Sequence, residues 1–165
     1  MRISTGLALL ICMALSTTVQ AVSCSQSNLD DAIFYDKKLG DYYNDAIDIY
    51  QESCKYEIHY NRGNAESIKQ AISQLNEIVN ETNRALKKVE KAQKYYKKAS
   101  DLYYDLHEAC DGSNSDDMYD NYSELYDWAN DDHLYGDNDL RDGLVKCRKK
   151  AKGSIKELND LKQGL

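Results

Sequence analysis

The sequence predicts an all-α protein, a disulfide-stapled bundle of four or five helices with a long central helix. Two observations carry this prediction. The chain of 165 residues contains no proline and only 8 glycines, the residues that the turns between strands favour. Apolar residues also recur at three- and four-residue spacing, which is the period of an amphipathic helix. We therefore expect one helical domain over residues 22–165, without an internal repeat.

The first 21 residues have the layout of a secretory signal peptide. Arg2 precedes an apolar run over 3–15, and small residues at Val19 and Ala21 form a cleavage site. The apolar run is shorter than a membrane span requires. We therefore expect residues 1–21 to be removed, and the rest of the chain to be secreted and extracellular, without a membrane partner.

The first helix is predicted over residues 28–62. Gly40 is expected to bend or break it, and Gly63 suits a left-handed cap at its C-terminus. Asn64 suits the N-cap of the next helix. The apolar stripe consists of Leu29, Ala32, Ile33, Leu39, Tyr43, Ala46, Ile47, Tyr50, Cys54 and Ile58.

The second helix, over residues 65–110, has the most regular pattern of the chain. Its apolar positions first alternate steps of four and three, as in a heptad seam. Past Val89 the stripe drifts, which favours a long bundle helix over a strict coiled coil. An unbroken helix of this length would span about 65–70 Å. The seam is Ile68, Ile72, Leu75, Val79, Thr82, Leu86 and Val89, followed by Ala92, Tyr96, Ala99, Tyr103, Leu106 and Cys110.

Two further helices are predicted after a polar loop at 111–115. Ser115 is expected to cap a short helix, whose first turn carries acidic residues at the favourable end of the helix dipole. A polar connection over 130–138 precedes a last helix over 139–163. The apolar stripes are Met118, Tyr122, Leu125 and Ala129 in the short helix, and Leu140, Leu144, Cys147, Ala151, Ile155, Leu158 and Leu161 in the last.

Removal of the leader also removes Cys12 and leaves four cysteines, an even number that predicts two disulfides in an oxidising compartment. Three pairings are possible. If the turn at 63–64 joins two long helices, Cys24 and Cys110 lie at similar distances from it, while Cys54 lies near it. Helix lengths therefore favour Cys24–Cys110 and Cys54–Cys147. The wide spacing of the thiols does not suit a metal site.

Charge is segregated along the chain, whose formal net charge is −7. Lys87, Lys91, Lys94 and Lys98 share one helix face, while residues 111–142 form an acidic tract whose spacing does not match a calcium-binding loop. The acidic balance argues against nucleic-acid binding. The basic face is either a solvated surface with intramolecular charge pairs, or a contact for a polyanion or a charged plasma protein. The scattered histidines suggest no catalytic set, so we expect neither an enzyme nor a cofactor.

Tyrosine is the most unusual component, with 14 residues against one Phe and one Trp. Tyrosine is enriched in binding surfaces because it offers a large, rigid contact area and a hydroxyl group. Many of these residues can equally be core or boundary residues. The candidate partner-binding residues are Tyr95, Tyr96, Tyr103, Tyr104, Lys91, Lys94 and Lys98, and the glycosylation candidates are Asn80 and Asn121.

A small, proline-free helical chain with a leader, two disulfides and a tyrosine-rich acidic surface resembles the small secreted salivary proteins of anopheline mosquitoes, the group of anophensin and albicin. The resemblance implies a salivary effector that inhibits a host plasma defence system, either the alternative complement pathway or contact (kallikrein–kinin) activation. The alternative is an odorant-binding-like carrier of biogenic amines or lipids. The long gap between Cys54 and Cys110 departs from that cysteine pattern.

Overall fold

The structure, a computed structural model, describes residues 22–136 and 138–165 and is all-α over those residues. Its helices are α1 (Gln26–Cys54), α2 (Ala65–Ala109), α3 (Ser113–Trp128) and α4 (Leu140–Gln163). A π-helical turn, η1 (Ala129–His133), follows α3 directly. The predicted bundle of four or five helices with a long central helix is thus confirmed. The expected signal peptide at residues 1–21 lies outside the described residues.

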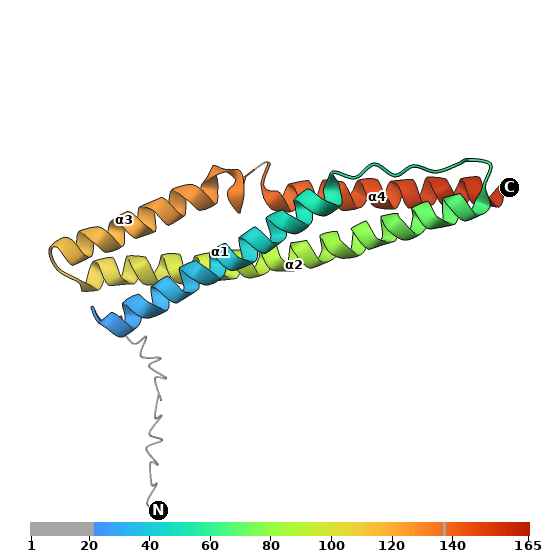
Figure 1. Ribbon diagram of the computed structural model, residues 1–165. Helices are drawn as coiled ribbons and strands as arrows, with labels where there is room; N and C mark the ends of the chain where they lie inside the picture. The colour runs from blue at the N-terminus through green and yellow to red at the C-terminus, as the bar shows by residue number, and fades with distance from the viewer. Residues whose placement is uncertain (1–21, 137) are drawn as a thin grey trace, which may run out of the picture.

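Helix α2 is the spine of the molecule, and every other helix packs along it (Figure 1). Its 45 residues correspond to about 68 Å at the rise of an α-helix. Helices α3 and α4 follow one another along α2, and η1 lies at their junction. Helix α1 runs antiparallel to α2, mainly over the half that also carries α3. That half therefore has three layers of helix, and it contains most of the candidate residues.

A single heptad seam runs along α2, and the predicted drift past Val89 is wrong. Buried positions recur at alternating steps of three and four residues along the helix. Tyr96 occupies one of these positions but is only half-buried. Ile72 and Val79, which were predicted in the seam, are half-buried on its flank. The buried stripe is wide because α2 contacts α1, α3 and α4. The buried seam positions are Ile68, Ala71, Leu75, Ile78, Thr82, Ala85, Val89, Ala92, Ala99, Tyr103 and Leu106, and Leu86 and Ser100 are buried beside them.

Helix α1 differs from its prediction at two points. Gly40 neither bends nor ends it, and the helix stops at Cys54 rather than near residue 62. The segment that follows leaves the helical path, and there Tyr56 and Ile58 pack against a second apolar cluster, which α2 forms with α4. Burial of these two side chains outweighs the helical periodicity of the sequence.

The turn before α2 is built by asparagines. The Asn64 side chain accepts hydrogen bonds from the backbone of Glu66 and Ser67, both at 3.0 Å, so the predicted N-cap is confirmed. Gly63 is not a left-handed C-cap, because α1 ends before it and the described glycines with positive φ are Gly112 and Gly136. The Gly63 backbone N–H instead donates to the Asn61 side chain.

Helix α3 begins at Ser113, two residues before the predicted cap. Gly112 precedes it with φ of 60°, a left-handed value that glycine adopts without strain. Ser115 therefore lies inside the first turn, where its hydroxyl contacts α2 instead of capping α3. Helix α4 is capped by Asp139, whose carboxylate accepts the backbone N–H of Asp142 at 2.7 Å.

Two disulfides link Cys24 to Cys110 and Cys54 to Cys147, with sulfur–sulfur distances of 2.02 and 2.09 Å. This is the pairing that the helix lengths favoured. The first joins the start of α1 to the end of α2, and the second joins the end of α1 to α4. Each closes a long loop and stabilises the fold by about 4 kcal/mol on the chain-entropy account.

A helix both long and apolar enough to cross a membrane does not occur in the described part of the chain.

Candidate binding surfaces

The tyrosines of the three-layer half form two surfaces on opposite flanks of α2. Tyr95 and Tyr96 show the division, because neighbouring side chains on a helix point about 100° apart. Tyr95 contacts rings on α1, whereas Tyr96 contacts Tyr135 beyond η1. We name the first surface the lysine-covered cluster, formed by Tyr35, Tyr42, Tyr95, Lys88, Lys91 and Lys98. The second is the tyrosine face, formed by Tyr96, Tyr104, Tyr119, Tyr122, Tyr126 and Tyr135.

In the lysine-covered cluster, the aromatic rings are occupied by the protein's own cations. Tyr42 stacks on Tyr95 with ring centroids 5.6 Å apart. The Lys91 ammonium lies 4.9 Å from the centre of the Tyr42 ring, and the Lys98 ammonium lies 4.6 Å from that of Tyr35. Cation–π contacts of this kind stabilise both partners. This surface is therefore largely satisfied within the chain.

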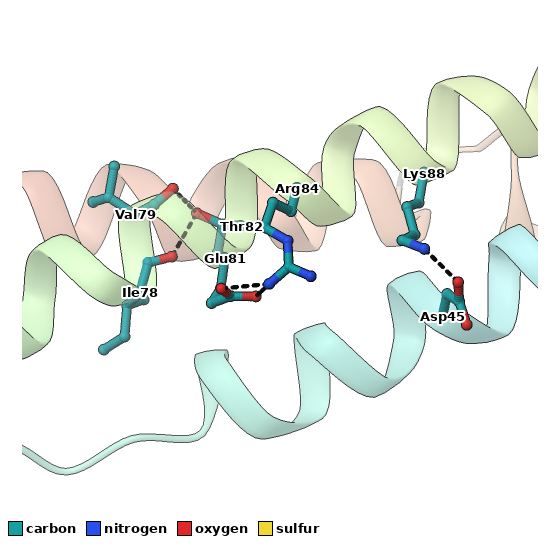
Figure 2. A network of polar contacts seen from close by, with 7 residues as sticks. All are labelled: Asp45, Ile78, Val79, Glu81, Thr82, Arg84 and Lys88. Atoms are coloured by element: carbon teal, nitrogen blue, oxygen red, sulfur yellow. Dashed lines mark hydrogen bonds and ion pairs between the residues drawn. The ribbon is translucent and has the colours of Figure 1, made fainter.

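An ion pair between helices supports the same cluster. Lys88 of α2 reaches across to Asp45 of α1 (Figure 2). Its ammonium also lies 5.7 Å from the centre of the Tyr42 ring. The ion pair between Arg84 and Glu81 lies within α2 and is solvent-exposed, so it contributes little to stability. Lysines of this part of α2 thus make contacts within the molecule, to side chains of α1.

The tyrosine face contains a connected group of four rings on α2 and α3 and a separate contacting pair, Tyr96 with Tyr135. Tyr122 is at the centre of the group, with ring centroids 5.4 Å from Tyr104, 6.2 Å from Tyr119 and 6.0 Å from Tyr126. The side chains of Tyr104, Tyr119 and Tyr126 are 44%, 48% and 49% exposed. Within residues 22–136 and 138–165, no ammonium or guanidinium group lies over these rings. These rings also contact one another and, at Tyr104 and Tyr119, the His107 imidazole, and their exposed parts are available to a partner.

The surroundings of the tyrosine face are acidic. The sequence has no Lys or Arg between Ser100 and Leu140. Asp116, Asp120 and Asp127 are exposed on the outer side of α3, next to the tyrosines. Burial raises the pKa of Tyr96 and of Tyr135 above the usual value of 10.0, so these two phenols add no charge at neutral pH. The face therefore presents aromatic rings in a negative field.

His107 and Ser115 hold the two helices of the tyrosine face together. The His107 Nδ1 atom lies 3.0 Å from the Ser115 carbonyl oxygen and 2.9 Å from its hydroxyl. Since a carbonyl only accepts hydrogen bonds, Nδ1 carries the proton and donates it. The hydroxyl in turn donates to the His107 carbonyl at 2.9 Å. The imidazole Nδ1 is thus committed as a donor, and the pair is a clamp between α2 and α3.

The predicted partner-binding residues do not form one site. Tyr103 is only 4% exposed, so its prediction as a surface residue is wrong. It lies on the heptad seam of α2, whereas its neighbour Tyr104 points outward onto the tyrosine face. Lys94 is exposed on the outer side of α2. Tyr96 and Tyr104 join the tyrosine face, while Tyr95, Lys91 and Lys98 belong to the lysine-covered cluster.

Both sequon asparagines are exposed. Asn80 lies on the outer side of α2, while Thr82 is buried and donates its hydroxyl to the carbonyl of Ile78 at 2.9 Å (Figure 2). The Asn121 side chain donates to the Asp117 carbonyl at 2.7 Å. Asn121 also lies at the edge of a groove on the other flank of α3.

This α1–α3 groove was not found from the sequence. It has a volume of about 410 Å³ and is open to solvent. One wall comes from α1 and the other from α3, and Tyr103 of α2 lies at its floor. The only sequence signal for it is one face of α1, on which the lining residues recur every three or four positions around Gly40. The lining residues are Asp36, Leu39, Gly40, Tyr43 and Asn44 of α1, Tyr103 of α2, and Asn121, Glu124, Leu125 and Trp128 of α3.

In the described part of the chain, His, Cys, Asp and Glu side chains form no cluster suited to a metal ion.

Comparison with known proteins found no matching family model, no matching curated protein and no matching solved structure. The fold and its surfaces assign the protein to the class of disulfide-stapled, all-helical bundles. Its distinguishing feature is an uncovered tyrosine face.

Proposed function

We propose that the protein is a secreted inhibitor that binds a host plasma protein or complex through the tyrosine face. The observation that carries the proposal is the group of four contacting tyrosines around Tyr122, three of them about half exposed, over whose rings no ammonium or guanidinium group of residues 22–136 and 138–165 lies. Tyrosines of this kind are typical anchors of protein interfaces, since they bury much area and lose little conformational entropy.

The tyrosine face is held rigidly, which favours binding. The Cys24–Cys110 disulfide ties down the end of α2, and the His107–Ser115 clamp ties the start of α3 to it. A surface that is ordered before binding loses less entropy in the complex. The tyrosine positions are therefore suited to anchor a partner without rearrangement.

The acidic surroundings favour a target with a basic surface. Exposed carboxylates at Asp116, Asp120 and Asp127 would steer such a partner toward the rings, and salt would weaken this effect. We therefore propose the acidic side of the molecule for the interface, because Lys91 and Lys98 already contact rings of the chain itself. All four lysines of the basic face are exposed, and contact with a polyanion would rely mainly on the two without such a contact, Lys87 and Lys94.

The resemblance to anopheline salivary proteins suggests two systems to test, the alternative complement pathway and contact activation. The oxidised protein is titrated into plasma, with haemolysis by the alternative pathway and kallikrein generation on an anionic surface as the two readouts. We expect dose-dependent inhibition of one of them. Affinity capture from plasma then identifies the target, whose surface we expect to be basic.

A matched pair of variants assigns the surface. Tyr119→Ala combined with Tyr126→Ala truncates two exposed rings of the tyrosine face, while Tyr60→Ala truncates an exposed tyrosine far from it. We expect the double variant to lose about 100-fold in affinity, as for two interface anchors, and Tyr60→Ala to be unchanged. Equal inhibition by both variants would assign binding elsewhere. Inactivity of the unmodified protein in both assays would remove the proposed function.

The carrier alternative has one supporting observation, the α1–α3 groove. Its volume of about 410 Å³ lies near the lower end of the range for small-molecule sites.

A further inference from the structure

The α1–α3 groove combines an aromatic lining with two acidic residues. Asp36 lies on the α1 wall and Glu124 on the α3 wall, while Tyr43, Tyr103 and Trp128 supply aromatic surface between them. Neither Lys nor Arg is among the lining residues. The groove therefore presents negative charge and π-electron density together, two features that both attract an organic cation.

Asp36 lacks a compensating partner. No hydrogen bond or ion pair of its carboxylate is present within residues 22–136 and 138–165. Burial raises the pKa of Asp36 above the ordinary value of 3.8, because removal from water disfavours the charged form. The Asp36 side chain is nevertheless exposed at the groove, so its carboxylate is accessible to an incoming cation, which gains a charge-assisted contact there.

Gly40 keeps the groove open. It lies in the middle of α1, where glycine is less favourable for a helix than alanine. Packing does not explain it, since a Cβ atom at this position would meet nothing within 4 Å. A larger side chain would instead project into the groove between Asp36 and Tyr43. The glycine thus costs helix stability and leaves space for a ligand.

We infer that the α1–α3 groove binds a small organic ammonium ion with a flat apolar body. The ammonium group pairs with Asp36 and is also attracted by Glu124. The body of the ligand lies on the apolar lining, which Leu39, Tyr103 and Leu125 form together with Trp128. This site lies on the opposite flank of α3 from the tyrosine face, so the inference does not depend on the proposed inhibitor function. It specifies a ligand class for the carrier alternative.

Charge and size select this ligand class. A fatty acid or phosphate-bearing lipid would bring an anion between two carboxylates. A volume of about 410 Å³ suits a body of one or two rings, since larger drug-sized ligands need sites toward the upper end of about 300–1,000 Å³. We therefore commit to a free amine rather than a lipid. A lysine side chain of a protein partner is the competing source of the same ammonium chemistry.

The single tryptophan of the chain makes the test direct. Trp128 lines the groove and is the only Trp in the sequence, so its fluorescence reports on occupancy. The probes are phenethylamine, its neutral analogue phenethyl alcohol, its anionic analogue phenylacetate, and Nα-acetyl-lysine methylamide as the protein-like arm. The protein is produced without glycans, because Asn121 lies at the rim of the groove.

We expect phenethylamine to give a saturable change in Trp128 fluorescence, and the alcohol to bind about 10-fold more weakly for loss of the charge-assisted contact. Phenylacetate should not bind. Equal affinity for the amine and the alcohol would overturn the inference. Tighter binding of the lysine derivative than of phenethylamine would also overturn it, in favour of a docking site for a protein side chain.

Variants locate the site. Asp36→Asn should weaken phenethylamine binding about 10-fold, and Gly40→Leu should abolish it by filling the groove. Asp48→Asn removes an exposed carboxylate of the same helix outside the groove and should change nothing. Circular dichroism and thermal melting show whether each variant folds. Undiminished binding by folded Gly40→Leu would overturn the inference, whatever the outcome of the plasma assays.

Discussion

The two tyrosine surfaces flanking α2 contain the same residue type and behave differently. In the lysine-covered cluster, Lys91 and Lys98 lie over the rings of Tyr42 and Tyr35. The tyrosine face has comparable ring-to-ring contacts but acidic neighbours, and its rings remain uncovered. The charge of neighbouring side chains, more than the number of tyrosines, therefore decides whether an aromatic surface is free for a partner.

The strongest test of this comparison separates rigidity from stability. Removal of the Cys24–Cys110 disulfide by alanine at both positions should lower the free energy of unfolding by about 4 kcal/mol, and removal of Cys54–Cys147 should cost about as much. Chemical denaturation measures both. The first bond lies at the end of α2, close to the tyrosine face, and the second joins α1 to α4.

Only loss of Cys24–Cys110 should also weaken target binding, measured below the melting temperature of the variant. If loss of Cys54–Cys147 weakened binding equally, rigidity at the α3 end would not explain the properties of the tyrosine face.

Matched substitutions in the two surfaces give the next largest effect. Tyr122→Leu removes the ring at the centre of the tyrosine face, and Tyr42→Leu removes the ring under Lys88 and Lys91. We expect the first to weaken target binding about 30-fold, as for an interface anchor. The second should lower the free energy of unfolding by about 1–2 kcal/mol and leave binding unchanged. Surface plasmon resonance and denaturant unfolding measure the two quantities. If Tyr42→Leu weakened target binding and Tyr122→Leu lowered only the free energy of unfolding, the roles of the two surfaces would be reversed.

A cation placed beside the tyrosine face should make it resemble the lysine-covered cluster. Ser123 lies four residues after Tyr119 and three before Tyr126, positions whose side chains are neighbours on a helix. Ser123→Lys should cover exposed rings and reduce target affinity about 10-fold, with little change in stability. Ser123→Gln is the uncharged control and should bind normally. If both variants bound alike, ring coverage by a cation would not be the relevant difference.

Periodicity predicted the helical class, the extent of α2 and the disulfide pairing, because these follow from local pattern and helix length. It did not predict where α1 ends, since Tyr56 and Ile58 leave the helix to pack against α2 and α4. Tyr103 and Tyr104 were both candidates for the binding surface, but Tyr103 also lay in the predicted apolar stripe, and the structure buries it there while Tyr104 stays exposed. Two seam phases fit the first half of α2, and only packing selects the one that buries Ala71 and Ile78 rather than Ile72 and Val79.

The α1–α3 groove lay beyond sequence reasoning for a related reason. Its walls are single faces of two helices far apart in the chain, and its width depends on how both pack on α2. Asp36 and Glu124 acquire a shared environment only through that packing.

The smallest expected effect concerns this groove, the third surface of the same half. Burial raises the pKa of Asp36 in the folded state above its ordinary value of 3.8. The folded protein therefore holds this proton more tightly than the unfolded chain. The contribution of Asp36 to stability is favourable at low pH and is lost as pH rises through the window above 3.8.

Asp36→Asn should thus raise the melting temperature slightly at pH 7 and leave it unchanged at pH 3, where both forms are neutral. Scanning calorimetry at the two pH values measures this difference, with Asp48→Asn as the control on α1 outside the groove. A gain in stability together with a loss of amine binding is typical of a residue kept for ligand recognition. A loss of stability at pH 7 would instead assign Asp36 a structural role and weaken the contrast between this groove and the satisfied, lysine-covered cluster.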